Sequence, residues 1–248
     1  FTIVSTKIIH YSSMCYFSLT YLGAYVMYNI AEQKERAQKW MGILVAALSS
    51  VYVIVIVALP WVGKHAAELA NSGRIKDAFA VANLQADVFW GGWESLIALI
   101  LVAGSILFFR YWRKQLFYNA FGWLYGSMAI FTFVAMFVIT PRVEGYTQRA
   151  VIEFYQEIAH DDNYVQPLGF KSYAHYFYAE RMPADNQKSK DKNWLLTGDI
   201  DKKAWFVVKV HKKEQYMKSF PHLKEYKSKN GFVFFYREPE NIYTTPND

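Results

Sequence analysis

Lys7, His10 and Tyr11 bring a cation, an imidazole and a phenol together directly before an apolar run, Ser12 to Ile30. On a helix, spacings of three and four residues place Lys7 beside both His10 and Tyr11 on one face. At a bilayer surface this face could hold a lipid phosphate, because lysine acts as a point charge and the phenol donates a hydrogen bond. From spacing alone, the residues favour a simpler interpretation, an interfacial lysine followed by a tyrosine of an aromatic belt.

Three further polar residues are secondary candidates. Glu94 follows Gly91-Gly92 and is the only carboxylate within a predicted membrane span. A carboxylate there is a functional candidate, although a position about one turn from the span's end also suits a structural role. Lys171 and Arg181 flank an aromatic segment and could contact a glycan or a lipid head group, or lie on a solvated strand edge.

No metal site is predicted. Asp199 and Asp201 resemble the start of a calcium loop, but the further oxygen ligands and the closing glutamate do not follow, which favours a turn. The histidines of the tail lack metal-ligand spacing. Phosphate-loop, dinucleotide and serine-hydrolase motifs are also missing from the sequence.

The elements that must position these residues fall into two halves of unlike composition. Residues 1–140 hold 16 charged residues and residues 141–248 hold 32. Only the first half offers runs of about 20 apolar residues, the length that crosses a bilayer. Four transmembrane helices are predicted, near residues 11–30, 40–60, 88–109 and 116–140. Neither half is strongly basic, so nucleic acid is not expected as a partner.

The distribution of cations predicts the orientation. The two short loops between spans carry six cations, namely Lys34, Arg36, Lys39, Arg110, Arg113 and Lys114. The positive-inside rule makes these loops cytoplasmic, so that the opening motif, residues 61–87 and the whole tail lie on the outer side. In a bacterium, that outer side is the periplasm. Residues 62–84 are predicted as two short helices around Asn71-Ser72-Gly73, either lying on the membrane or serving as a simple connector.

Residues 141–248 predict one small α/β domain. Expected helices follow Thr147 as a cap and cover 212–220, and short strands are expected at 164–168 and 173–178. The apolar run 204–210 is typical of a strand buried on both faces. Residues 226–236 predict a hairpin that turns at Asn230-Gly231.

The string S-T-K-I-I-H-Y-S-S-M-C-Y-F-S-L-T-Y-L resembles a late extracytoplasmic segment of polytopic glycosyltransferases with the GT-C fold, the class of aminoarabinose and protein O-mannosyltransferases. The family's K-x-P-x-Y element is matched by Lys7 and Tyr11, with Ile9 in place of the proline and His10 before the tyrosine. The strings K-S-Y-A-H-Y-F-Y-A-E-R and W-L-L-T-G-D-I-D are similar to the α/β domain that ends many bacterial members.

This resemblance implies transfer of a sugar from a polyprenyl-phosphate donor to a lipid, glycan or protein acceptor in the cell envelope, at the periplasmic face of the bacterial inner membrane. Lys7, Tyr11 and His10 would bind the donor phosphate. The family's catalytic aspartate lies in an earlier loop, so no catalytic residue is assigned here, and an N-terminal half of the same protein is expected before Phe1. The alternative is a non-enzymatic membrane subunit whose periplasmic domain binds a ligand or partner.

Overall fold

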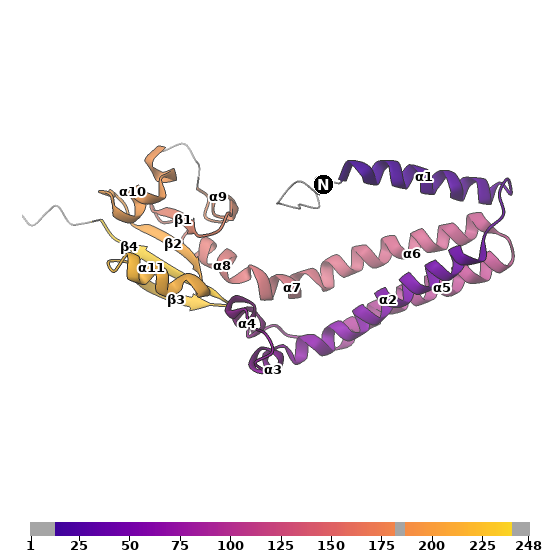
Figure 1. Ribbon diagram of the computed structural model, residues 1–248, viewed down its shortest axis with the longest axis horizontal. Helices are drawn as coiled ribbons and strands as arrows, with labels where there is room; N and C mark the ends of the chain where they lie inside the picture. The colour runs from indigo at the N-terminus through magenta and orange to yellow at the C-terminus, as the bar shows by residue number, and fades with distance from the viewer. Residues whose placement is uncertain (1–12, 182–186, 240–248) are drawn as a thin grey trace, which may run out of the picture. The chain divides into compact units, whose positions relative to one another are not determined.

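The computed structural model describes residues 13–181 and 187–239, which form two compact units (Figure 1). The helical unit comprises Phe1–Pro60 and Gly91–Val138, and the sheet unit comprises Trp61–Trp90 and Ile139–Asp248. The long loop between the second and third predicted spans therefore belongs with the tail. Two segments that are folded into one unit must lie on the same side of a membrane, as the charge distribution predicts.

The helical unit contains three helical segments that are long and apolar enough to cross a membrane, which indicates a membrane protein. They are α2 (Lys39–Lys64), η2 with α5 (Trp93–Ile97 and Ala98–Arg113, together Trp93–Arg113) and α6 (Phe117–Val138). These segments match the second, third and fourth predicted spans in length and apolar composition. The third begins later than predicted, because Gly92 adopts a φ of 95° and the helix starts only after it.

The first predicted span is a helix, α1 (Ser13–Ala31), but it is not among the three segments that meet the requirements for a span. Its serines, tyrosines and Asn29 lower its hydropathy, although it carries no charged residue. The prediction of four spans is therefore supported for three of them.

Helices α5 and α6 pack closely along a stripe of small and aromatic residues (Figure 1). The buried positions are Ala98, Leu101, Gly104 and Phe108 on α5, and Ala120, Ser127 and Phe131 on α6. A Cβ atom at Gly104 would lie 2.0 Å from the Ser127 hydroxyl oxygen, so only glycine permits this approach.

The sheet unit is built on a four-stranded sheet with the order β1-β2-β4-β3, in which β1 and β2 are parallel and the other pairs antiparallel. Its strands are β1 (Tyr164–Leu168), β2 (Ala204–Lys209), β3 (Lys224–Lys229) and β4 (Phe232–Arg237). Its helices are α3 (Ala66–Asn71), α4 (Ala78–Leu84), α7 (Thr140–Thr147), α8 (Arg149–Glu157), α9 (Ala174–Tyr178), η3 (Gln187–Lys190), α10 (Lys192–Thr197), η4 (Val210–Lys212) and α11 (Lys213–Ser219).

The sheet buries both of its faces, because alternate residues of the central strands point to opposite sides. On β2, Trp205 and Val207 join one apolar cluster, and Phe206 and Val208 join the other. The predicted two-sided burial of this strand is confirmed. The first cluster also receives the buried face of α8, and the second receives α10.

Most of the predicted tail elements are confirmed, including β1, α8, α11 and the hairpin, whose turn residues Asn230 and Gly231 have φ values of 47° and 78°. The predicted cap is wrong: Gln148 occupies the cap position of α8, and the Thr147 hydroxyl donates to carbonyls of α7. The strand predicted at 173–178 is also wrong, because this segment is helix α9. His175 within α9 and Ala179 directly after it are buried, and their spacing of four residues is helical.

The loop between α2 and η2 forms the two predicted short helices, and α4 packs against the sheet unit. The Asp77 side chain caps α4 by accepting from the backbone N–H of Phe79 at 2.9 Å. The Phe79 ring meets Phe232 edge to face at 5.1 Å and lies under the Lys209 ammonium group at 4.5 Å. The loop is therefore more than a simple connector, since it contributes to the core of the sheet unit.

Candidate functional site

The residues of the opening motif, Lys7, His10 and Tyr11, lie outside the described residues. The description begins at Ser13, the first residue of α1. Their joint binding of a phosphate therefore stays a prediction, and the other candidates are considered one by one.

Glu94 holds the backbone turn from which the third span begins. Its carboxylate is fully buried and accepts hydrogen bonds from the backbone N–H groups of Gly91, at 3.0 Å, and Gly92, at 2.7 Å. These bonds satisfy donors that a helix start leaves open, and they place a negative charge at the positive end of the helix dipole. This geometry supports the structural interpretation of Glu94.

Within the sheet unit, Tyr146 connects α7 to the end of α2. The Trp90 indole N–H donates to the Tyr146 hydroxyl at 3.0 Å, and that hydroxyl donates to the Gly63 carbonyl oxygen at 3.2 Å. A Cβ atom at Gly63 would lie 2.3 Å from the Trp90 ring nitrogen. This arrangement was not predicted, because it joins residues that are far apart in the sequence.

Arg181 fastens the segment after α9 to the loop between α8 and β1. Its Nη2 atom donates to the Ile158 carbonyl and the Asn163 side-chain oxygen, both at 2.8 Å, and to the Asp161 carbonyl. Partial burial lowers the pKa of this guanidinium. Since these bonds occupy its Nη2 group, Arg181 has a positioning role in the sheet unit, whereas Lys171 is exposed.

Aromatic rings gather on and beside α9, and we call the exposed Tyr173 and Phe177 and the partly buried Tyr176 the aromatic platform. Tyr173 and Phe177 are 76% and 77% exposed, which is unusual for rings of this size on a folded domain. The rings of Tyr173 and Tyr176 are nearly parallel, with centroids 6.2 Å apart and planes inclined by 16°. Flat exposed rings, which follow the exposed cation Lys171 in the sequence, suit stacking on a sugar or insertion at a membrane interface.

His175 anchors the platform from below. Its ring is 2% exposed and lies between Tyr176, at 4.1 Å, and Tyr155, at 6.1 Å. Burial, helped by the charge of Lys192, lowers the pKa of His175 to about 4, so the imidazole is neutral at pH 7. Burial also raises the pKa of the Tyr155 phenol. The buried side of α9 therefore packs against the Tyr155 ring, with His175 neutral at pH 7.

Within residues 13–181 and 187–239, no group of three or more His, Cys, Asp or Glu side chains is placed to hold a metal ion. Asp201, the second member of the calcium-like string, accepts a hydrogen bond from the Tyr164 hydroxyl at 2.9 Å. This bond ties the turn before β2 to the beginning of β1.

Comparison with known proteins found no matching family model, no matching curated protein and no matching solved structure.

Proposed function

We propose that the chain is part of an integral membrane glycosyltransferase of the GT-C type, which moves a sugar from a polyprenyl-phosphate donor to an acceptor at the outer surface of the membrane. Lys7 and Tyr11 would bind the donor phosphate, assisted by His10. As negative charge develops on the departing phosphate, a fixed cation and a phenolic donor would stabilise it.

One observation carries the proposal: the loop Trp61–Trp90 and the tail Ile139–Asp248 form a single unit. Helices α2, α5 and α6 then cross the membrane between this side and the cation-rich side. If the uncharged helix α1 crosses as well, the opening motif emerges on the side of the sheet unit. That is the periplasmic side by the positive-inside rule, where a lipid-linked donor would meet its acceptor.

The aromatic platform gives the sheet unit a role within this function. Tyr173 and Phe177 offer flat apolar surfaces and Lys171 a nearby cation, which suits an acceptor that carries sugar rings and anionic groups. The same platform favours the second candidate, a non-enzymatic membrane subunit that binds a glycan or partner, because such binding requires no donor site.

The test measures binding of undecaprenyl phosphate to the purified full-length protein, together with sugar transfer from the native lipid-linked pool in isolated membranes. We expect Lys7→Ala and Tyr11→Phe each to weaken binding by about 10-fold, the effect of losing a charge-assisted hydrogen bond. Lys76→Ala, which removes an exposed cation from the outer loop, and Glu94→Gln should change it far less.

Unchanged lipid binding and unchanged transfer in the Lys7 and Tyr11 variants would refute the donor-site assignment. If Tyr173→Ala and Phe177→Ala then abolish retention of a glycan or partner, the non-enzymatic candidate holds instead.

A further inference from the structure

A groove of about 890 Å³ runs between α2 and α5 within the helical unit. Helix α2 approaches the η2–α5 segment at two points: the Ser95 hydroxyl of η2 donates to the Val57 carbonyl at 3.2 Å, and a Cβ atom at Gly42 would lie 3.6 Å from the Phe109 ring of α5. Between these contacts the walls are mostly apolar, with hydroxyl groups from Ser49, Ser50 and Ser105.

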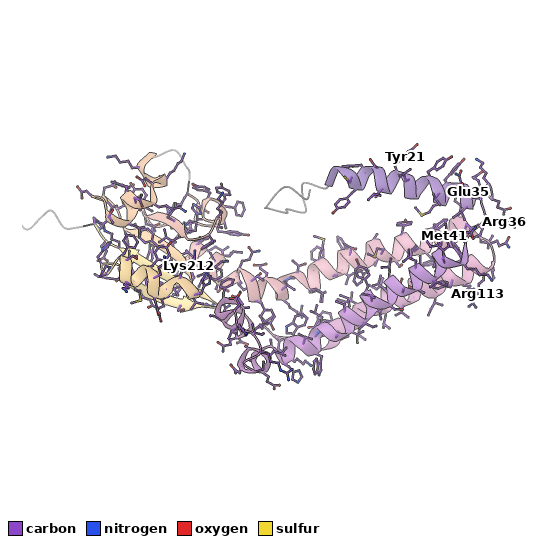
Figure 2. All side chains as sticks on the ribbon, viewed as in Figure 1. Tyr21, Glu35, Arg36, Met41, Arg113 and Lys212 are labelled. Atoms are coloured by element: carbon purple, nitrogen blue, oxygen red, sulfur yellow. The ribbon has the colours of Figure 1, made fainter. Side chains whose placement is uncertain are left out.

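Three cations from the end of α5, Arg110, Arg113 and Lys114, line this groove, and no acidic residue does. All three are exposed, and among the described residues none of their side chains forms an ion pair. Figure 2 shows Arg113 at the same end of the helical unit as Arg36 and Met41. This is the end that the positive-inside rule assigns to the cytoplasm.

Among the described residues, neither Glu32 nor Glu35 forms an ion pair with any of the three cations. The Tyr118 hydroxyl donates to the Glu32 carboxylate. Glu35 lies on the loop that also carries Lys34 and Arg36, and Lys34 lies over the Tyr28 ring at 4.9 Å. Positive charge therefore accumulates at one end of a mostly apolar groove.

We propose that this groove binds an anionic phospholipid of the cytoplasmic leaflet. An acyl chain occupies the wall formed by Val53, Ile54 and Ile106, and the phosphodiester contacts Arg110, Arg113 and Lys114. Basic pockets between transmembrane helices on the cytoplasmic side are suited to such head groups, and arginine can bind phosphate oxygens with two parallel hydrogen bonds. This site is separate from the donor site proposed at Lys7 and Tyr11.

The experiment titrates the detergent-solubilised full-length protein with phosphatidylglycerol and counts bound lipid by native mass spectrometry. Each cation near an anionic head group contributes about a 5-fold gain in affinity. We expect the triple variant Arg110→Ala/Arg113→Ala/Lys114→Ala to bind at least 10-fold more weakly. The matched control, Lys34→Ala/Arg36→Ala/Lys39→Ala, removes equal charge from the same side but touches no groove residue, and it should change affinity less than about 3-fold.

Two further measurements separate the groove from a simple anion site. Ile106→Trp fills the groove without changing its charge and should also reduce phosphatidylglycerol binding. Inorganic phosphate at about 10 mM should not displace the lipid. Arg113→Gln changes a single exposed side chain and should weaken binding about 5-fold even if the triple variant misfolds.

Four results would overturn the proposal. Equal loss in the two triple variants would leave only the general surface charge, and displacement by inorganic phosphate would leave only a free-anion site. Equal binding of phosphatidylcholine would remove the role of the cations. Failure of the wild-type protein to bind the lipid would mean that another segment or a second copy fills the groove.

Discussion

Acid should destabilise the sheet unit through His175. Its folded pKa is about 4, below the ordinary value of 6.5, so between these values the unfolded chain binds more protons than the folded one. The stabilising effect of the neutral imidazole is therefore complete above about pH 6.5 and is lost as the pH falls toward 4. The full gap corresponds to about 3 kcal/mol, of which about 2 kcal/mol is lost between pH 7.5 and pH 5.

The assay is urea unfolding of the full-length protein in nanodiscs, followed by tryptophan fluorescence at a series of pH values. With a urea dependence of about 2 kcal/mol/M, the midpoint should fall by about 1 M between pH 7.5 and pH 5. His175→Phe should abolish most of this fall, because a phenylalanine ring binds no proton. The substitution breaks no hydrogen bond of the side chain, since neither ring nitrogen of His175 has a partner among the described residues. The exposed His160 provides the matched control, His160→Gln. If His175→Phe and wild type lose the same stability between these pH values, burial of His175 is not the cause.

Two other substitutions test the packing of each unit. Gly104→Ala should lower the free energy of unfolding of the helical unit by about 1–3 kcal/mol, because the new Cβ atom would overlap Ser127. In the control Gly122→Ala, the new Cβ atom meets no atom within 4 Å, and the change should be neutral or stabilising. Thermal unfolding in nanodiscs, followed by circular dichroism, compares the two variants. Phe79→Ala should lower the free energy of unfolding of the sheet unit by about 2–3 kcal/mol and make the loop between α2 and η2 sensitive to limited proteolysis. The control Phe89→Ala alters a 79% exposed ring of the same loop and should leave the loop's resistance to proteolysis unchanged.

The sequence predicts those parts of the fold that depend on local periodicity. An apolar run identifies β2, and Asn230-Gly231 identifies the hairpin, because a positive φ at both turn positions favours these two residue types. The strand prediction for residues 173–178 is wrong because four of these six residues are tyrosine or phenylalanine, types that favour strands. Its helical form depends on packing of His175 and Ala179 against the domain, which is a tertiary effect.

The candidate sites divide in the same way. A structural role for Glu94 could be considered from the sequence, because its partners Gly91 and Gly92 precede it by only three and two residues. The role of Arg181 could not be predicted, since it bonds to carbonyl groups about 20 residues earlier in the chain. Nor could the insertion of Phe79 beside Phe232, because more than 150 residues separate the two rings.

The two proposed phosphate sites lie on opposite sides of the membrane if α1 crosses it, and they can then be tested independently. Lys7 precedes α1, whereas Arg36, after the end of α1, lies at the same end as Arg113 (Figure 2). If α1 crosses the membrane, the bilayer separates Lys7 from the groove by roughly 30 Å, and salt in the water on each side screens both groups of charges. Electrostatic coupling between the sites should then be negligible. Lys7→Ala should leave phosphatidylglycerol binding unchanged, and loss of the groove cations should leave undecaprenyl phosphate binding unchanged; mutual effects would place both groups at one surface and refute the crossing of α1.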